Sequence, residues 1–175
     1  MQPKRKIVEP HAKVEEKNMK GKTVKESNVT MTQYMTPQDV NVAGNVHGGV
    51  IMKLIDTAAG IVAVRHARAN AVTASIDRLD FHSPIFAGDV VTLKASLNLV
   101  GRTSMEVGVR VESENLLTGE TQHTASAYLT FVALDRNKRP LEIPSLILET
   151  EEEKRRNREA EARRKARLKE KHEEG

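Results

Sequence analysis

The chain has no cysteine, no tryptophan and only five aromatic residues among its 175. Without cysteine it has no disulfide framework, no thiolate nucleophile and no cysteine-based zinc site. So few aromatic side chains argue against a base-stacking surface for nucleic acid. No apolar run reaches the roughly 18 residues of a membrane span, and the N-terminus lacks the apolar core of a signal peptide. We therefore expect a cytoplasmic protein with neither a membrane nor a nucleic-acid partner.

The excess positive charge sits at the two ends of the chain. Residues 1–26 carry eight Lys/Arg against four Asp/Glu, and residues 150–175 carry ten against eight, whereas residues 27–149 carry ten against twelve. We predict a flexible basic arm over the first segment, a folded domain over the middle one, and a charged tail that is helical or disordered. The tail has one large apolar residue, Leu168, so we expect a solvated helix with no stripe to bury.

The middle segment contains one helix-like and several strand-like patterns. Strand-like stretches lie at residues 28–36, 71–82, 89–100, 103–114 and 121–134. Residues 48–67 are apolar almost all round, which predicts a helix buried on most of its faces. Short turns join the last four strands, so the sheet is largely antiparallel. We predict an α+β fold in which about five curved strands wrap a long helix, and in which a sheet edge pairs with a second copy.

Two glycines stand at the start of the predicted helix and an aspartate lies within it. The segment reads NVAGNVHGGVIMKLIDTAA over residues 41–59. Gly48 and Gly49 allow a ligand close to the first N–H groups of the helix, which have no helical partner and can stabilise an oxyanion. Asp56 lies among apolar residues, where desolvation makes a carboxylate more basic. These features suit acyl transfer, with Asp56 as a base or a nucleophile.

The spacing of these groups predicts a site shared between two subunits. The seven residues from Gly49 to Asp56 give roughly 10 Å of helix rise. A base and an oxyanion hole must act on the same carbonyl, each within about 3–4 Å of it. One helix does not supply both, whereas antiparallel helices of two subunits do. We therefore expect the site at a dimer interface.

This segment, together with VTASIDRLDFHSPIFAGDVV and VGRTSMEV further along, resembles the hotdog-fold acyl-CoA thioesterases, and especially the cytosolic long-chain acyl-CoA hydrolases. The resemblance covers about residues 25–150. It implies the hotdog fold and hydrolysis of fatty acyl-CoA to free fatty acid and CoA. It implies no metal and no cofactor beyond the CoA of the substrate. It also implies a homodimer, assembled as a trimer of dimers into a hexamer.

The resemblance further implies roles for single residues. Asn41 and Asp56 match an asparagine and an aspartate that act together from opposite domains in tandem members of the family. Because both stand in one domain here, a homodimer would build two equivalent sites. Asn41 would orient water or the thioester, and the N–H groups at Gly48 and Gly49 would polarise its carbonyl. The residues expected to contact the substrate or its CoA are Arg102, Thr103, Ser104 and His47.

Plainer roles stay open for the same residues. Asp56 can be a structural acid that pairs with Lys53 or Arg65. Asn41 can be a turn residue, and His47 can simply cap the helix. Two rival functions also remain. One is a hotdog enzyme of another reaction, such as a dehydratase, although a dehydratase uses a histidine with an acid. The other is an acyl-CoA-binding regulatory module without activity.

Overall fold

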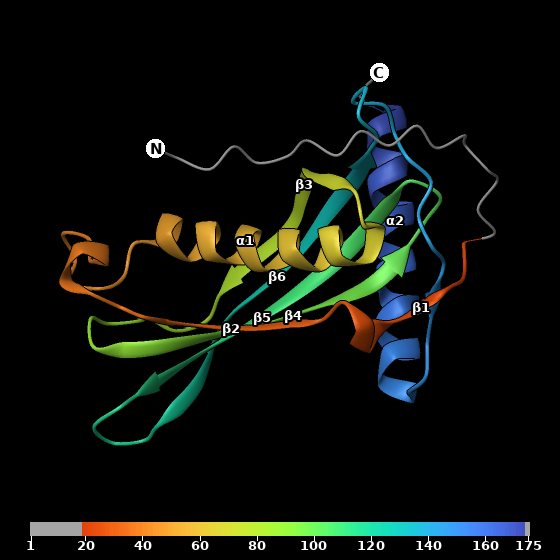
Figure 1. The fold of residues 1–175 in the computed structure, drawn as a ribbon. Helices are drawn as coiled ribbons and strands as arrows, with labels where there is room; N and C mark the ends of the chain where they lie inside the picture. The colour runs from red at the N-terminus through yellow and green to blue at the C-terminus, as the bar shows by residue number, and fades with distance from the viewer. Residues whose placement is uncertain (1–18, 174–175) are drawn as a thin grey trace, which may run out of the picture.

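The computed structural model describes residues 19–173 of the chain (Figure 1). Its strands are β1 (Lys22–Thr23), β2 (Val29–Tyr34), β3 (Asn70–Phe81), β4 (Asp89–Val100), β5 (Ser104–Asn115), β6 (Thr121–Leu134) and β7 (Leu146–Ile147). Its helices are α1 (Gly48–Ala67) and α2 (Glu151–Glu173), with short 3-10 turns η1 (Val24–Glu26) and η2 (Pro37–Asp39). Within the described residues, no helix combines the length and apolarity needed to cross a membrane.

Five strands form one antiparallel sheet in the order β2-β4-β5-β6-β3, with α1 lying across one face. The predicted helix over 48–67 coincides with α1, and each predicted strand lies within two residues of an observed one. The α+β architecture is therefore confirmed. The two edges of the sheet are β2 and β3, and the outer edge of β3 has no strand beside it within the described chain.

The strand register fixes which residues lie at which end of the sheet. Thr73 pairs with Phe131, and Phe131 pairs with Met105, directly after the turn between β4 and β5. Phe81 lies at the other end of β3, and the position of a Cβ on Gly48 is only 3.5 Å from its ring. One end of β3 thus lies with the β4–β5 turn, and the other lies with the first turn of α1.

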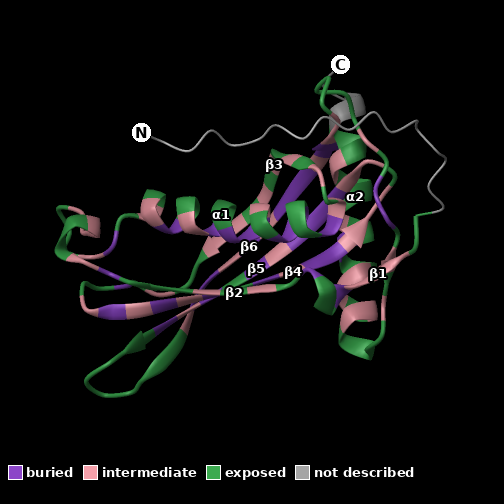
Figure 2. Cartoon of the chain, in the orientation of Figure 1, coloured by how far each residue is buried: buried purple, intermediate pink, exposed green. Residues whose placement is uncertain are grey.

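One side of α1 packs on the sheet and the other side is uncovered (Figure 2). Its buried residues are Ile51, Ile55, Ala58, Ala59, Val62, Ala63 and His66. Met52, Ile61 and Val64 are 41%, 37% and 44% exposed, so the expectation of a helix buried on most faces is wrong for the single chain. The reason is geometric, since one sheet layer covers one side of a helix. The apolar residues on the open side remain free for a second layer.

The C-terminal helix α2 is docked on the opposite face of the sheet, so the expectation of a solvated tail helix is also wrong. Asn157 Nδ2 donates to the backbone oxygen of Asn98 at 2.8 Å, and Arg163 forms an ion pair with Glu106 at 2.7 Å. Ala160, between these residues, is fully buried. A helix without an apolar stripe docks here because the sheet face beneath it is polar and meets its donors.

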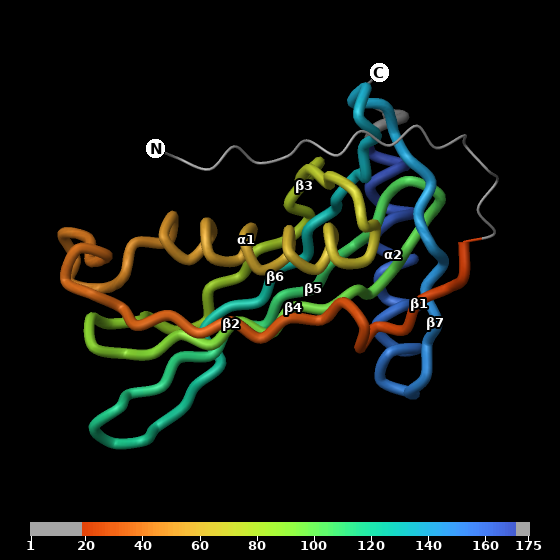
Figure 3. The backbone as a smooth tube through the Cα atoms, viewed as in Figure 1, coloured from red at the N-terminus to blue at the C-terminus, as the bar shows by residue number. Residues whose placement is uncertain are grey.

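The first described residues also belong to the folded unit. β1 pairs in parallel with β7 beside the end of α1 (Figure 3), and Val24 is buried. The expected flexible arm over 1–26 therefore does not extend to residues 22–26, which form β1 and η1. The rest of that expectation, over residues 1–18, lies outside the described residues.

Candidate active site

A tight loop before α1 holds Asn41. Val40 and Val46 form an isolated antiparallel bridge, and Gly44 closes the loop with a φ of 86°. The Asn41 side chain accepts from the Ala43 N–H at 2.8 Å and donates to Asn45 Oδ1 at 2.6 Å. Asn41 is therefore a turn residue, as one of the open interpretations held. The second N–H of its amide group has no acceptor among the described residues.

His47 caps the first turn of α1. Its Nδ1 accepts the Gly49 N–H at 2.9 Å, which satisfies one donor of the helix N-terminus. With Nδ1 as acceptor, a neutral His47 ring carries its proton on Nε2. Of the two N–H groups expected to polarise a carbonyl, that of Gly49 is thus occupied. The N–H of Gly48 has no partner within the described chain, and Gly48 is one of the residues that line a cavity.

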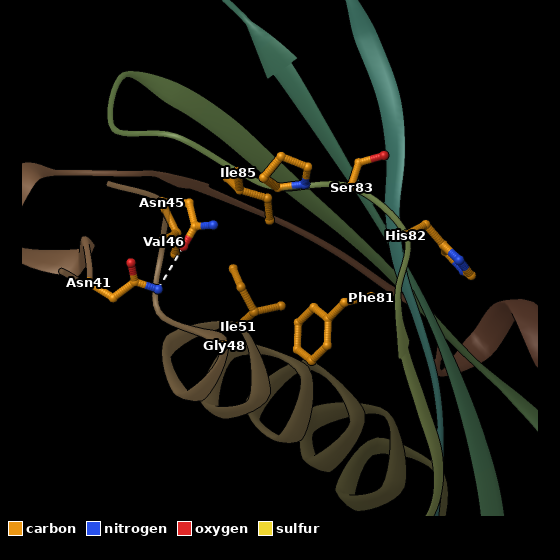
Figure 4. A pocket seen from close by; sticks show the side chains of 10 residues that line it. Asn41, Asn45, Val46, Gly48, Ile51, Phe81, His82, Ser83 and Ile85 are labelled. Atoms are coloured by element: carbon orange, nitrogen blue, oxygen red, sulfur yellow. Dashed lines mark hydrogen bonds between the residues drawn. The ribbon is translucent and has the colours of Figure 1, made fainter. Parts of the chain in front are cut away.

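That cavity, of about 540 Å³, lies between the loop, the start of α1 and the segment after β3 (Figure 4). It is lined by Asn41, Asn45, Val46, Gly48, Ile51, Phe81, His82, Ser83, Pro84 and Ile85. Figure 4 shows Phe81 beside Ile51 at the helix end, with the two asparagines on the opposite wall. The combination of apolar walls with a few amide groups is typical of a pocket for a small, partly apolar ligand. Asp56 is not part of this wall.

Asp56 lies in the middle of α1 on the side that faces β3. Its Oδ1 accepts a hydrogen bond from Thr73 Oγ1 at 2.5 Å. Both residues are exposed in the single chain, so its own subunit does not provide the burial that the sequence analysis expected for Asp56. Neither Lys53 nor Arg65 forms an ion pair with it in residues 19–173, and Arg65 instead donates to the Asn28 backbone oxygen.

The hydrogen bond from Thr73 identifies a candidate site residue that the sequence analysis missed. A threonine is an ordinary residue in an edge strand, and its distance along the chain from Asp56 shows no helical or strand period. Only the pairing of α1 with β3 brings the two side chains together. A hydroxyl that donates to one carboxylate oxygen fixes the rotamer of the acid and leaves the second oxygen available as an acceptor.

The predicted CoA-contacting segment forms the turn between β4 and β5. The Gly101 N–H donates to the Ser104 backbone oxygen at 2.7 Å, and the Thr103 backbone oxygen accepts from Ala133 at 2.9 Å. The Arg102 side chain is 80% exposed and forms a surface ion pair with Glu142 at 3.0 Å. The turn is thus firmly attached to the sheet while its arginine remains accessible to solvent.

The candidate residues therefore fall into two separate groups within the subunit. One group comprises Asn41 and Gly48 around the cavity, beside Phe81. The other comprises Asp56 and its partner Thr73, in the same cross-strand row as the start of β5. Eight residues of extended strand separate Thr73 from Phe81, or roughly 27 Å. Within the described chain, one subunit does not bring the two groups together.

Metal ligands are not concentrated at either group. Within the part of the chain that the structure describes, no three His, Asp or Glu side chains gather in a geometry for a metal ion.

Comparison with known proteins places this geometry in a family. Residues 43–120 match the model of the thioesterase superfamily. The chain is 46% identical over 129 residues to an uncharacterized acyl-CoA thioester hydrolase of Bacillus subtilis, an alignment that covers 74% of this chain and 75% of the relative. It is 39% identical over 148 residues to the cytosolic acyl coenzyme A thioester hydrolase of Rattus norvegicus, covering 83% of this chain but only 39% of that longer protein.

Solved structures of similar sequence share the fold. An acyl-CoA hydrolase from Bacillus cereus is 42% identical, with a TM-score of 0.84 over 89% of this chain and 94% of its own. A hexameric acyl-CoA thioesterase is 41% identical, with a TM-score of 0.84 over 87% of this chain and 97% of its own. The acyl-CoA hydrolase of Staphylococcus aureus, with butyryl-CoA and CoA bound, is 35% identical with a TM-score of 0.81 over 87% of this chain and 93% of its own.

Three further structures of the Staphylococcus aureus enzyme carry alanine in place of an asparagine, an aspartate or a threonine. The identity and coverage of these relatives confirm the resemblance on which the hotdog fold was predicted. This chain is therefore a member of the acyl-CoA thioester hydrolase family of the thioesterase superfamily, and its fold is the hotdog fold.

Proposed function

We propose that this protein hydrolyses fatty acyl-CoA to a free fatty acid and CoA at a site shared between two subunits. One subunit contributes Asp56 and Thr73, and the other contributes Asn41 and the Gly48 N–H. The single observation that carries the proposal is the hydrogen bond between Thr73 and Asp56 on the open side of α1, beside the unpaired edge of β3.

The spacing of the residues replaced in the Staphylococcus aureus enzyme supports this set. Its substituted asparagine precedes the aspartate by 15 positions, and its threonine follows the aspartate by 17. Asn41, Asp56 and Thr73 have the same residue types at the same spacing. Thr73, which contacts Asp56 here, is thus the counterpart of a residue chosen for replacement together with the asparagine and the aspartate.

The exposed apolar residues support the shared site. Ile76 and Phe81 on β3 are 41% and 51% exposed, and both pair with core residues of β6 on the face of the sheet that carries α1. Pairing two β3 edges covers these side chains and gives hydrogen-bond partners to the backbone N–H and C=O groups of the free edge. Because the pairing is antiparallel, the Thr73 end of one subunit meets the Phe81 end of the other. It would also remove Asp56 from bulk water, the desolvation that a base requires.

The chemistry follows from these positions. Asp56 either accepts a proton from the attacking water or attacks the thioester carbon itself, giving an anhydride that water opens. In both routes the C–S bond breaks and the CoA thiolate takes up a proton. In the first route the fatty acid takes its new oxygen from water. In the second route water opens the anhydride at the Asp56 carbonyl carbon, so the fatty acid takes its new oxygen from the Asp56 carboxylate. The Asn41 amide orients the water or the thioester, and the Gly48 N–H stabilises the oxyanion. Thr73 holds the Asp56 carboxylate in place.

Single turnover in H₂¹⁸O separates the routes, because only attack by Asp56 places the label in its side chain.

Asp56→Asn tests the catalytic role, because it keeps the shape of the side chain and removes its basicity. We expect thiol release from acyl-CoA to fall by at least about 100-fold while CoA binding persists. Thr73→Ala should reduce the rate less, since it loosens the acid without removing it. A wild-type protein that binds acyl-CoA and never releases thiol would instead indicate a regulatory module.

Mixing two inactive variants tests the shared site. Asp56→Ala and Asn41→Ala homodimers each lack one contribution to every site, whereas a mixed dimer retains one complete site. Random reassociation should therefore restore about a quarter of wild-type activity, since half of the dimers are mixed. Circular dichroism and sedimentation should first establish that both variants fold and associate. A fully active monomer, or no recovery in mixed dimers, would exclude the shared site.

We also propose that the dimers assemble further into hexamers, as in the hexameric thioesterase structure similar to this chain. The rat relative is named a cytosolic enzyme, which supports a cytosolic location for this protein. Sedimentation of the purified protein tests the first proposal.

A further inference from the structure

A small hollow lies where the β4–β5 turn meets α2. Its lining includes Gly101 and Ser104 from the turn, Thr130 from β6, and Arg164 and Arg167 from α2. Two regions that are about 60 residues apart in the sequence therefore share one surface. The turn is the segment that the family resemblance associates with CoA, whereas α2 belongs to no motif identified in the sequence.

Arg164 lies directly against the backbone of the turn. The position that a Cβ would take on Gly101 is 3.2 Å from Arg164 Nη1 and 3.4 Å from Nη2. Because Gly101 has no side chain, the Arg164 guanidinium has room to lie against the turn. The hydrogen bond from the Gly101 N–H to Ser104 keeps the turn in position beneath it.

The charges around the hollow are balanced except for that of Arg164. Arg167 forms an ion pair with Asp77, and Glu106 forms one with Arg163. Arg164 is exposed and forms no hydrogen bond or ion pair within the described part of the chain. Its neighbours on α2 thus hold the helix to the sheet, while Arg164 supplies one uncompensated positive charge beside the turn.

We propose that Arg164 binds a phosphate of the CoA portion of the substrate, which makes α2 part of the substrate site. The inference rests on the proposed acyl-CoA thioesterase function. A guanidinium donates two parallel hydrogen bonds to a phosphate, and the Ser104 hydroxyl lies in the same hollow as a further donor. Arg102, exposed on the same turn, is already paired with Glu142 at 3.0 Å, so Arg164 supplies the free charge. The acyl and pantetheine parts of the substrate carry no charge of this kind, so Arg164 acts on the nucleotide end.

Steady-state kinetics on the full-length protein test this role. The substrates are an acyl-CoA and the matching acyl-pantetheine, which has the same thioester but no phosphate. Arg164→Ala should raise KM for the acyl-CoA about fivefold, leave kcat unchanged, and leave both constants for the acyl-pantetheine unchanged. Arg164→Lys should recover part of the loss, because it restores the charge without the paired donors. Arg158→Ala is the matched control, since Arg158 is an exposed arginine of the same helix outside the hollow.

Titration of CoA by calorimetry gives a second readout that does not depend on turnover. Weaker CoA binding by Arg164→Ala, with unchanged binding by Arg158→Ala, supports the inference. Equal CoA binding by wild type and Arg164→Ala overturns it, as does an equal rise in KM for acyl-pantetheine. If wild type binds CoA but releases no thiol, the proposed hydrolysis fails, and the calorimetric comparison still decides the role of Arg164.

Discussion

The two helices of this protein pack on opposite faces of the same sheet by different physical means. α1 buries aliphatic side chains such as Ile51, Ile55 and Val62, each of which contributes roughly 2 kcal/mol by leaving water. α2 buries one alanine and otherwise docks through arginines and an asparagine that meet polar groups of the sheet. The first interface is stabilised by non-directional burial of apolar surface, whereas the second requires matched donors and acceptors.

This difference explains why one helix could be placed from its sequence and the other could not. An apolar run predicts a helix that buries at least one of its faces. A charged helix is compatible with solvent or with a polar partner, and the partner here consists of Asn98 and Glu106 on strands with their own apolar pattern. The predictions below test how strongly each interface contributes to the stability of the fold.

The largest expected effect comes from the aliphatic interface. Ile55→Ala removes a side chain that is 1% exposed and leaves a cavity between α1 and the sheet. The free energy of unfolding, measured in urea, should fall by about 3 kcal/mol. Lys53→Ala, at an exposed position of the same helix, should change it by less than about 0.5 kcal/mol. A loss below about 1 kcal/mol for Ile55→Ala would show that the α1 interface contributes little.

Breaking an ion pair of the ionic interface should lower the unfolding free energy by less than Ile55→Ala does. The loss should depend on how deeply the ion pair is buried. Arg163→Ala leaves the Glu106 carboxylate, which is 3% exposed, with the Asn98 amide as its one hydrogen-bond partner among the described residues. We expect a loss of about 2 kcal/mol in unfolding free energy. Arg155→Ala removes exposed pairs with Glu152 and Glu159 on the same helix and should cost clearly less, because solvent screens those pairs. Equal losses would mean that the contact with the sheet does not stabilise α2.

The smallest effect concerns a polar group inside the α1 interface. His66 is fully buried, its Nε2 donates to the Pro144 backbone oxygen at 2.7 Å, and its Nδ1 has no partner within the described residues. Burial lowers the pKa of His66 below its ordinary value of 6.5, with the nearby Lys22 acting in the same direction. The neutral form is thus favoured in the fold. Stability from this group is complete above about pH 6.5 and is lost as the pH falls through the lowered value.

His66→Gln checks this assignment, because a glutamine amide still donates to Pro144 and does not titrate. Unfolding free energies measured at pH 7.5 and 5.5 should differ less for the variant than for wild type. An unchanged pH dependence would mean that other groups produce the loss of stability in acid.

The residue types of the candidate site could be predicted from sequence, but their grouping could not. Gly48 and Gly49 at a helix start and Asp56 among apolar residues have local signatures. The capping of the Gly49 N–H by His47 is also a local contact. It occupies the N–H that was expected to stabilise an oxyanion, and only the structure decides between the two roles. Thr73 has no signature, because its role arises from the contact of α1 with β3.

The sequence by itself determined the elements of this protein, since hydrophobic period and turn residues act over a few positions. It determined the helix over 48–67, the strands around it and, through a motif at fixed spacing, the acyl-CoA thioester hydrolase family. Only the tertiary structure decided where α2 lies, that Asp56 is exposed in one subunit, and that Thr73 contacts Asp56 while Phe81 lies beside Gly48. Those facts depend on long-range pairing, in which polar contacts and strand register are specified jointly by segments far apart in the chain.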